Sequence, residues 1–248
     1  MSLPDDIIKS IKNVVGKEKH HLHEPLFFGN EIKYLKETIT TNLVSSVGPF
    51  VKKFEDQIKK FTKSKYAISV VNGTEALHLS LVACGVENND EVLVPSITFA
   101  GSANAIVYSG AIPHFVDSEF ETLGIDPLKL EKYLEKITIK KREFYFNKKT
   151  KRKIKAIMPV HIFGNICQID KILKIAKKYN LVIIEDAAEA LGSFYKNKHA
   201  GTFGSVGCFS FNGNKILTTG GGGAIITNNK LLAKKLKHLS TTAKINHR

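Results

Sequence analysis

The sequence lacks the usual marks of a secreted, membrane-spanning or disulfide-held protein. Its 248 residues include three cysteines, Cys84, Cys167 and Cys208, with no Cys-x-x-Cys pair. This scattered set predicts neither a disulfide framework nor a structural zinc site, and it suits a reducing cytoplasm. No apolar run approaches the roughly 20 residues that cross a membrane. The first residues, which include Asp5 and Asp6, do not resemble a secretory signal.

Internal repeats and low-complexity linkers are also lacking. Three histidines, His20, His21 and His23, could suggest a metal site, but no cluster of carboxylates or cysteines accompanies them. We therefore expect no metal, and we interpret residues 1–30 as a polar N-terminal segment. With 43% hydrophobic and 24% charged residues, residues 31–248 can form one large domain with a full core.

Acidic residues are few relative to basic ones, 23 against 37, and the formal net charge is +14. Many of the basic residues fall in the segment 140–155, which reads KKREFYFNKKTKRKIK. Such a segment could bind an anionic partner, and Phe144, Tyr145 and Phe146 could stack on bases. A solvated hairpin with alternating apolar and polar residues gives the same pattern. We favour the hairpin and expect no nucleic-acid partner.

Apolar periodicity predicts strands and helices in alternation along the chain. Strands are expected at 67–71, 91–95, 112–116, 155–160, 181–184 and 206–211. Helices are expected at 31–41, 50–62, from after the polar turn 72–75 to about 84, and at 98–109, 126–134, 168–179 and 230–239. Short apolar strands that alternate with helices indicate an α/β fold, with a mostly parallel central sheet covered by helices.

Polar residues follow five of the expected strands, where ligands collect in such a sheet. They are Asn72 to Glu75, Pro95 to Phe99, His161, Asp186, and Ser210 to Lys215. The first group leads into a helix, and free N–H groups and the helix dipole make a helix start a ready anion site. We expect one site to draw on all five groups.

Lys215 lies in a run of small and polar residues, FNGNKILTTGGGGA, unlike most lysines of the chain. Desolvation or a nearby charge can lower the pKa of a confined lysine, which then attacks aldehydes. The plainer alternative is a surface lysine in a turn. Asp186 also has two readings: it could cap the next helix, or it could keep a cationic ring nitrogen protonated, as pyridoxal phosphate (PLP) chemistry requires.

Five motifs stand in a fixed order along the chain. They read GTEALHLSL (73–81), PSITFAGSANAIVYSGAIPHFVD (95–117), PVHIFG (159–164), IIEDAAEALGS (183–193) and GTFGSVGCFSFNGNKILTTGGGGAI (201–225). Together they resemble the DegT/DnrJ/StrS sugar aminotransferases over about residues 25–248. The resemblance implies the large domain of PLP fold type I, the aspartate-aminotransferase-like fold. Members of that family continue into a small C-terminal domain, which we expect this chain to lack.

The resemblance also implies roles at the matching positions. Lys215 would be the Schiff-base lysine and the proton shuttle, and Asp186 would pair with the pyridinium nitrogen. His161 receives no role. The other implied cofactor contacts are Gly73, Thr74, the backbone of Glu75 and Ser210 around the phosphate, Phe99 and Ala188 on the two ring faces, and Glu189 near the ring hydroxyl.

Two departures from the common family pattern bear on the substrate. Asn212 stands where many members have His, and Gly220 to Gly223 stand where many read GEGG. With the ending LSTTAKINHR, they are similar to the branch that aminates UDP-4-keto-6-deoxy-N-acetylhexosamines on routes to legionaminic-type sugars.

The prediction is a PLP-dependent aminotransferase of surface amino-sugar biosynthesis. It would act as a homodimer on a nucleotide-linked keto sugar, with glutamate as amino donor. Two alternatives stay open: a truncated, non-catalytic paralogue, and a nucleic-acid-binding protein that uses the segment 140–155.

Overall fold

The computed structural model describes residues 2–16, 23–46 and 48–243. His20, His21 and the last five residues of the expected 31–248 domain lie outside the described residues. The division of the chain at residue 30 stays a prediction. The helices are α1 (Leu3–Val15), α2 (Glu31–Thr40), α3 (Pro49–Thr62), α4 (Gly73–Ala83), α5 (Ala100–Tyr108), α6 (Pro127–Ile137), α7 (Ile169–Tyr179) and α8 (Lys230–Ser240). The strands are β1 (Tyr66–Val70), β2 (Glu91–Pro95), β3 (Ile112–Val116), β4 (Thr138–Lys141), β5 (Phe144–Asn147), β6 (Lys153–Ile157), β7 (Val182–Asp186), β8 (Phe194–Tyr195), β9 (Lys198–His199), β10 (Val206–Ser210) and β11 (Gly223–Thr227).

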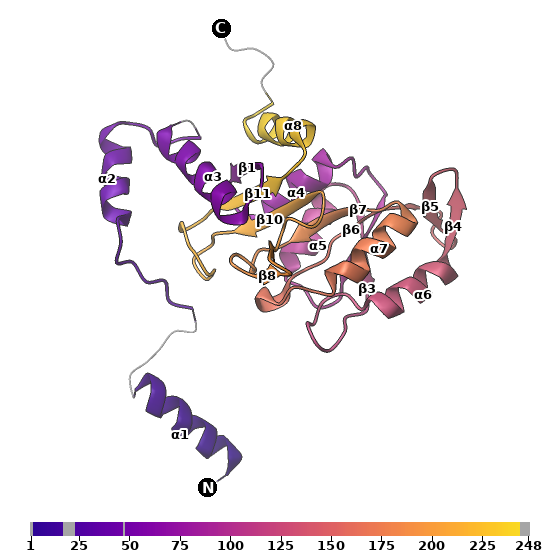
Figure 1. Ribbon diagram of the computed structural model, residues 1–248, viewed down its shortest axis with the longest axis horizontal. Helices are drawn as coiled ribbons and strands as arrows, with labels where there is room; N and C mark the ends of the chain where they lie inside the picture. Colours follow the sequence, from indigo (N-terminus) through magenta and orange to yellow (C-terminus); the bar gives the residue numbers. More distant parts are fainter. Residues whose placement is uncertain (1, 17–22, 47, 244–248) are drawn as a thin grey trace.

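A mixed, mostly parallel sheet forms the centre of the molecule (Figure 1). Its strand order is β1-β11-β10-β7-β6-β2-β3. The pairs β10–β7, β7–β6, β6–β2 and β2–β3 are parallel, whereas β11 runs antiparallel to β1 and β10 on either side. The expected α/β fold with a mostly parallel sheet is therefore confirmed. The carboxyl ends of β2, β6, β7 and β10 meet at one edge.

Helices cover both faces of the sheet because its strands are apolar on both sides. In β2, Val92 and Val94 pack with α4, α5 and α8, whereas Leu93 between them packs with α6 and α7. This alternation is the period of two that a strand imposes on its side chains. All three residues are 0% exposed, and burying each stabilises the fold by about 1.5–3 kcal/mol.

The expected strands and all the expected helices are confirmed, with ends that shift by a few residues. The expected cap of α6 is also present, since Asp126 accepts hydrogen bonds from the N–H groups of Leu128 and Lys129. The apolar pattern missed β11, although Ala224, Ile225 and Ile226 are buried there.

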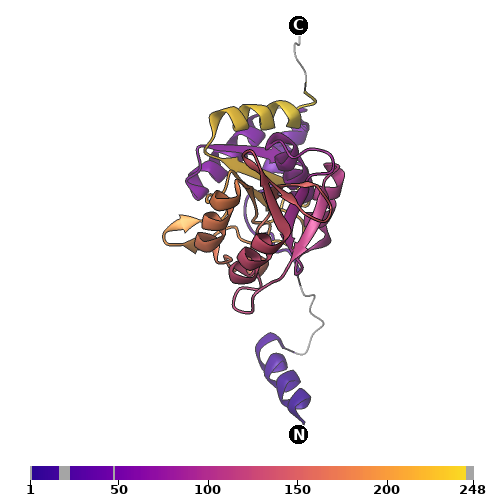
Figure 2. The ribbon, with the colours of Figure 1, turned by 90° about the vertical axis from the view of Figure 1, so that its right-hand side faces the viewer.

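The sequence reading assigned no helix to residues 1–30, and this was wrong for α1. Its helix is amphipathic, begins at the capping residue Ser2, and buries none of its side chains. Ile7, Ile8 and Ile11 are each about half exposed, and α1 stands apart from the sheet in both views (Figure 2). Within the described ranges, no helix combines the length and apolarity that a membrane crossing needs.

The basic segment 140–155 forms the hairpin that we favoured. β4 pairs antiparallel with β5, and β5 pairs antiparallel with β6. The lysines of the hairpin lie over its own aromatic rings: Lys140 Nζ is 5.9 Å from the Tyr145 centroid, and Lys141 Nζ is 5.4 Å from that of Phe146. These contacts occupy ring faces that base stacking would need.

Candidate active site

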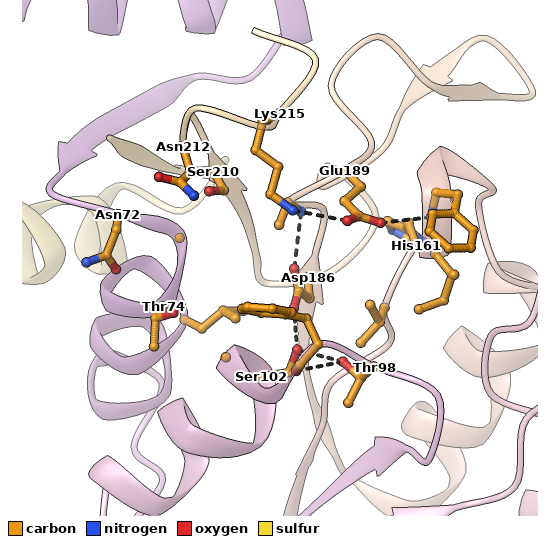
Figure 3. Close-up of a pocket in the computed structure, with 18 of the residues that line it drawn as sticks. Asn72, Thr74, Thr98, Ser102, His161, Asp186, Glu189, Ser210, Asn212 and Lys215 are labelled. Carbon is orange, nitrogen blue, oxygen red and sulfur yellow. Dashed lines mark hydrogen bonds and ion pairs between the residues drawn. The ribbon is translucent and has the colours of Figure 1, made fainter. Parts of the chain in front are cut away.

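A cavity of about 520 Å³ opens where the five polar groups come together (Figure 3). All five groups that follow strands contribute to it, as expected from the ends of a parallel sheet. Eight of the nine expected cofactor residues line it: Gly73, Thr74, Phe99, Asp186, Ala188, Glu189, Ser210 and Lys215. The ninth, Glu75, does not line it.

Asp186 is the last residue of β7 and is 5% exposed. Its Oδ2 accepts a hydrogen bond from Ser102 Oγ at 2.6 Å, and its Oδ1 accepts one from the Ala188 N–H at 3.1 Å. Burial raises the pKa of this carboxyl above its ordinary value, since the low-dielectric surroundings disfavour its charged form. Among the described residues, Asp186 forms no ion pair. It is a buried acid that a cation from the cavity would stabilise.

Ser102 is a site residue that sequence reasoning missed. Its hydroxyl also lies 2.7 Å from Thr98 Oγ1, so a chain of hydroxyls reaches from α5 to Asp186. A signal was available, because Ser102 follows Phe99 by three residues and so shares its side of the first turn of α5. Both residues line the cavity.

The start of α4 makes a close-packed polar corner. Asn72 caps this helix by accepting the Glu75 N–H at 2.7 Å, so that N–H already has a partner. A methyl group at Gly73 would lie 2.8 Å from the Cβ of Ser210, which is closer than such atoms approach. Gly73 therefore lets β10 and the start of α4 meet, and places the Thr74 and Ser210 hydroxyls at one end of the cavity.

Lys215 reaches into the cavity instead of extending into solvent. Its side chain is 14% exposed, and Nζ lies 3.0 Å from Oε1 of Glu189. The other oxygen of Glu189, Oε2, accepts the N–H of Phe163 at 3.0 Å. Glu189 thus holds the lysine on one side and a loop of the cavity wall on the other. The reading of Lys215 as a plain surface lysine is not supported by this burial.

His161 has a buried acidic partner that the sequence did not reveal. His161 Nε2 lies 3.0 Å from Oε2 of Glu185, and both side chains are 0% exposed. Desolvation would lower the pKa of His161, but interactions with the side chains of Cys167 and Glu185 outweigh it and raise the pKa to about 10.

Glu185 also ties down the segment that follows β9. Its carboxylate accepts the N–H groups of Gly201, Phe203 and Gly204. The pair His161–Glu185 therefore anchors the floor of the cavity. The described residues contain no group of His, Cys, Asp or Glu side chains arranged to hold a metal ion.

The two expected ring contacts differ in their setting. Phe99 precedes α5 and is 78% exposed at the cavity, whereas Ala188 is half-buried in the turn after Asp186. Both line the cavity, and an exposed aromatic face and a small residue suit contact with a flat ring. With a buried acid, a lysine and a helix start around the same space, the residues present fit PLP.

Comparison with known proteins supports the same reading. The model of the DegT/DnrJ/EryC1/StrS aminotransferase family matches residues 28–247. GDP-perosamine synthase of Caulobacter vibrioides is 45% identical over 215 residues, which are 87% of this chain and 54% of that protein. The putative pyridoxal phosphate-dependent aminotransferase EpsN of Bacillus subtilis is 38% identical over 92% of this chain and 56% of its own.

Solved structures agree with the sequence relatives. Helicobacter pylori PseC, an aminotransferase involved in the biosynthesis of pseudoaminic acid, superposes with a TM-score of 0.78 at 28% identity and covers 93% of this chain and 58% of its own. NtdA of Bacillus subtilis, solved with bound cofactor PMP, has a TM-score of 0.70 at 29% identity over 90% of this chain and 49% of its own. The expected fold class and cofactor are therefore supported. The chain spans about half the length of the relatives it matches, and it belongs to the DegT/DnrJ/EryC1/StrS aminotransferase family.

Proposed function

We propose that this chain binds PLP in the cavity and transaminates a nucleotide-linked keto sugar, with glutamate as the amino donor. The observation that carries the proposal is Asp186, a buried acid that forms no ion pair among the described residues and that lines the same cavity as Lys215. When bound, PLP supplies an aldehyde that amines attack and a cationic ring that accepts electrons.

Each neighbouring group then has a defined task. Asp186 would hold a proton on the ring nitrogen, and Ser102 orients that carboxylate through their hydrogen bond. Thr74 and Ser210 hold the phosphate with the first N–H groups of α4, where the helix dipole favours an anion. Phe99 covers one ring face. The role of the Glu75 backbone stays a prediction, and its N–H would have to leave Asn72 to fill it.

Lys215 would supply the amine that bonds to the aldehyde carbon, with the aldehyde oxygen leaving as water, and its Nζ would then hold and move a proton. An amine must lose its proton to act as a nucleophile, and the contact with the Glu189 carboxylate, 3.0 Å away, has to open for Nζ to react. The same contact keeps Nζ inside the cavity, close to the groups that hold the ring. Glu189 therefore serves Lys215 as well as the ring hydroxyl near which the family resemblance puts it.

The substrate class follows from two lines of support that differ in the nucleotide. The motifs resemble enzymes that use UDP-4-keto-6-deoxy-N-acetylhexosamines, whereas relatives named GDP-perosamine synthase point to a GDP-linked sugar. We propose a 4-keto-6-deoxy sugar on a nucleoside diphosphate, with UDP and GDP as the two forms to compare. The net charge of +14 suits a diphosphate. A homodimer in the cytoplasm is part of the proposal, and exposed Ile32 and Leu35 on α2 suit a protein partner.

Cofactor attachment is the direct test. The purified chain is titrated with PLP, its visible absorbance is recorded, and borohydride is added before peptide mapping. We expect an absorbance band and a reduced adduct on Lys215. Lys215→Ala should give neither, while Lys132→Ala, which removes an exposed lysine of α6, should match the wild type. Equal spectra for wild type and Lys215→Ala would overturn the proposal.

Turnover distinguishes the enzyme from a non-catalytic cofactor-binding protein. The loaded chain is given glutamate and a panel of UDP-, GDP- and dTDP-linked 4-keto sugars, and aminated products are detected by mass spectrometry. A product with one nucleotide identifies the substrate. Cofactor attachment without any product would favour the non-catalytic alternative.

A further inference from the structure

The loop between β6 and α7 is held firmly against the end of β7. The His161 N–H donates to the carbonyl of Asp186 at 3.0 Å, and the Asp186 N–H donates to the carbonyl of Pro159 at 2.9 Å. The buried His161–Glu185 contact adds a side-chain tie. The loop therefore has little freedom where it passes the cavity.

Phe163 sits in this loop in an unfavourable backbone conformation. Its φ of 51° and ψ of 26° are left-handed, a backbone conformation that is uncommon and strained for a bulky residue. Glu189 Oε2 holds the conformation by accepting the Phe163 N–H at 3.0 Å. Next along the chain, a methyl group at Gly164 would lie 3.1 Å from the Glu189 carbonyl, so the loop and the turn at Glu189 are in close contact.

The ring that this conformation presents is not part of the core. Phe163 is 78% exposed, yet it lines the cavity beside His161 and Ile162. An exposed aromatic ring is not stabilised by burial, so the strained backbone at Phe163 is not offset by packing of its side chain in the core. Strained, exposed residues at a cavity are typical of ligand contacts.

We propose that Phe163 packs against the sugar ring of the nucleotide-linked substrate, and that Glu189 is the positioning residue that keeps it there. This inference rests on the proposed function. The C–H face of a pyranose and the methyl group of a 6-deoxy sugar are apolar, and an aromatic ring gives them a large contact area. A uracil or guanine base can also stack on an aromatic ring, so the comparison with free GDP and UDP below decides whether the effect of Phe163 belongs to the sugar.

Glu189 links the loop that carries Phe163 to Lys215, because its two carboxylate oxygens bind different partners. Oε1 meets Lys215 Nζ, and Oε2 meets the Phe163 N–H, both at 3.0 Å. Removing the carboxylate should release Phe163 as well as Lys215. Replacing it with an amide keeps an oxygen for the Phe163 N–H while the charge beside Lys215 is lost.

The test measures binding by the chain loaded with pyridoxamine phosphate. Titration calorimetry compares GDP- and UDP-linked 4-amino-4,6-dideoxy sugars with free GDP and UDP. Phe163→Ala should weaken binding of the sugar nucleotide roughly tenfold and change binding of the free nucleoside diphosphate less than about twofold. Phe163→Tyr should restore the wild-type affinity, and Phe120→Ala, which removes a ring that is 97% exposed and does not line the cavity, should leave it unchanged.

The Glu189 variants test positioning separately. Glu189→Ala should weaken sugar-nucleotide binding as Phe163→Ala does, and Glu189→Gln should retain most of the affinity. Because the chain contains no tryptophan, Phe163→Trp provides a single tryptophan whose emission should respond to the sugar nucleotide but not to the free nucleotide.

The outcomes separate this inference from the proposed function. Equal sugar-nucleotide affinity for wild type and Phe163→Ala would overturn the role of Phe163. Equal weakening by Glu189→Gln and Glu189→Ala would overturn the hydrogen bond as the positioning contact. No binding of either sugar nucleotide by the wild type would overturn the proposed function, and this inference with it.

Discussion

Ser102 Oγ lies 2.6 Å from Oδ2 of Asp186, a contact between residues 84 positions apart in the chain. It joins the first turn of α5 to the end of β7. Among the described residues, Ser102 is the only one whose side chain donates a hydrogen bond to the Asp186 carboxylate. The other donor is the backbone N–H of Ala188. The orientation of the acid in the cavity therefore depends on a residue from another element.

Ser102→Ala tests that dependence. A hydrogen bond to the charged carboxylate favours the charged form, so its loss raises the pKa of Asp186 further and weakens the hold on a cationic ring. We expect PLP affinity to fall roughly tenfold, in line with about 1–3 kcal/mol for a lost bond to a charged group. Spectroscopic titration measures it. The Ser109 hydroxyl donates to the Ile106 carbonyl at the end of the same helix, so the control Ser109→Ala should leave the PLP affinity unchanged.

Asp186→Asn should separate stability from cofactor binding. The pKa of Asp186 is raised in the folded protein, so the folded state binds more protons and stability falls as pH rises from the ordinary value of 3.8 through the folded value. Asparagine does not titrate, so the Asp186→Asn variant does not lose stability over this pH range. At pH 7 the cofactor-free variant should be more stable by about 1–2 kcal/mol, measured by urea unfolding, and the two proteins should converge below pH 3.8.

The same variant should bind PLP at least roughly tenfold more weakly, because a neutral amide cannot hold the ring nitrogen in its charged form. If the cofactor-free Asp186→Asn variant were instead less stable than the wild type at pH 7, burial of the charged Asp186 carboxylate would not lower the stability of the folded protein.

His161→Ala should destabilise the protein in a pH-dependent way. The pKa of His161 is raised from 6.5 to about 10, so the stabilisation by its charge is complete below pH 6.5 and is lost as pH rises towards 10. Leaving Glu185 buried without its partner should cost about 3–5 kcal/mol at pH 6. Urea unfolding at pH 6 and at pH 9.5 should show a smaller cost at the higher pH. An equal cost at both would indicate that only packing is lost.

Gly73→Ala should damage the close-packed corner between α4 and β10. The new methyl group would meet the Cβ of Ser210 at 2.8 Å, which forces a shift that costs about 1–3 kcal/mol. Because Ser210 is part of the proposed phosphate site, affinity for inorganic phosphate should fall as well. Gly213→Ala is the matched control, since a methyl group there meets nothing within 4 Å, and it should change stability by less than about 0.5 kcal/mol.

Much of the fold could be predicted because local patterns are strong in this chain. The strand β7 is a short apolar run, and α6 carries its cap Asp126 and Pro127 in the sequence. The failures have physical reasons. β11 follows a glycine run that gives no periodicity, and it is a strand only because it fits between β1 and β10. α1 is amphipathic, but its apolar side is not buried against the sheet.

The candidate site was likewise predicted in part. Asp186, Lys215 and the start of α4 were expected from motifs, and the structure brings them to one cavity. The partners of these groups were not expected. Nothing in the sequence pairs Ser102 with Asp186, or His161 with Glu185.

The sequence by itself determined the family, the alternation of strands and helices, and which residue types follow each strand, since these are encoded in neighbouring positions. Only the tertiary structure decided that Glu189 binds Lys215 with one oxygen and the Phe163 N–H with the other. Such a contact joins three separate loops, and its geometry depends on how the sheet orders their strands. Local sequence carries propensity and periodicity, but distances between loops follow from the packing of the whole chain.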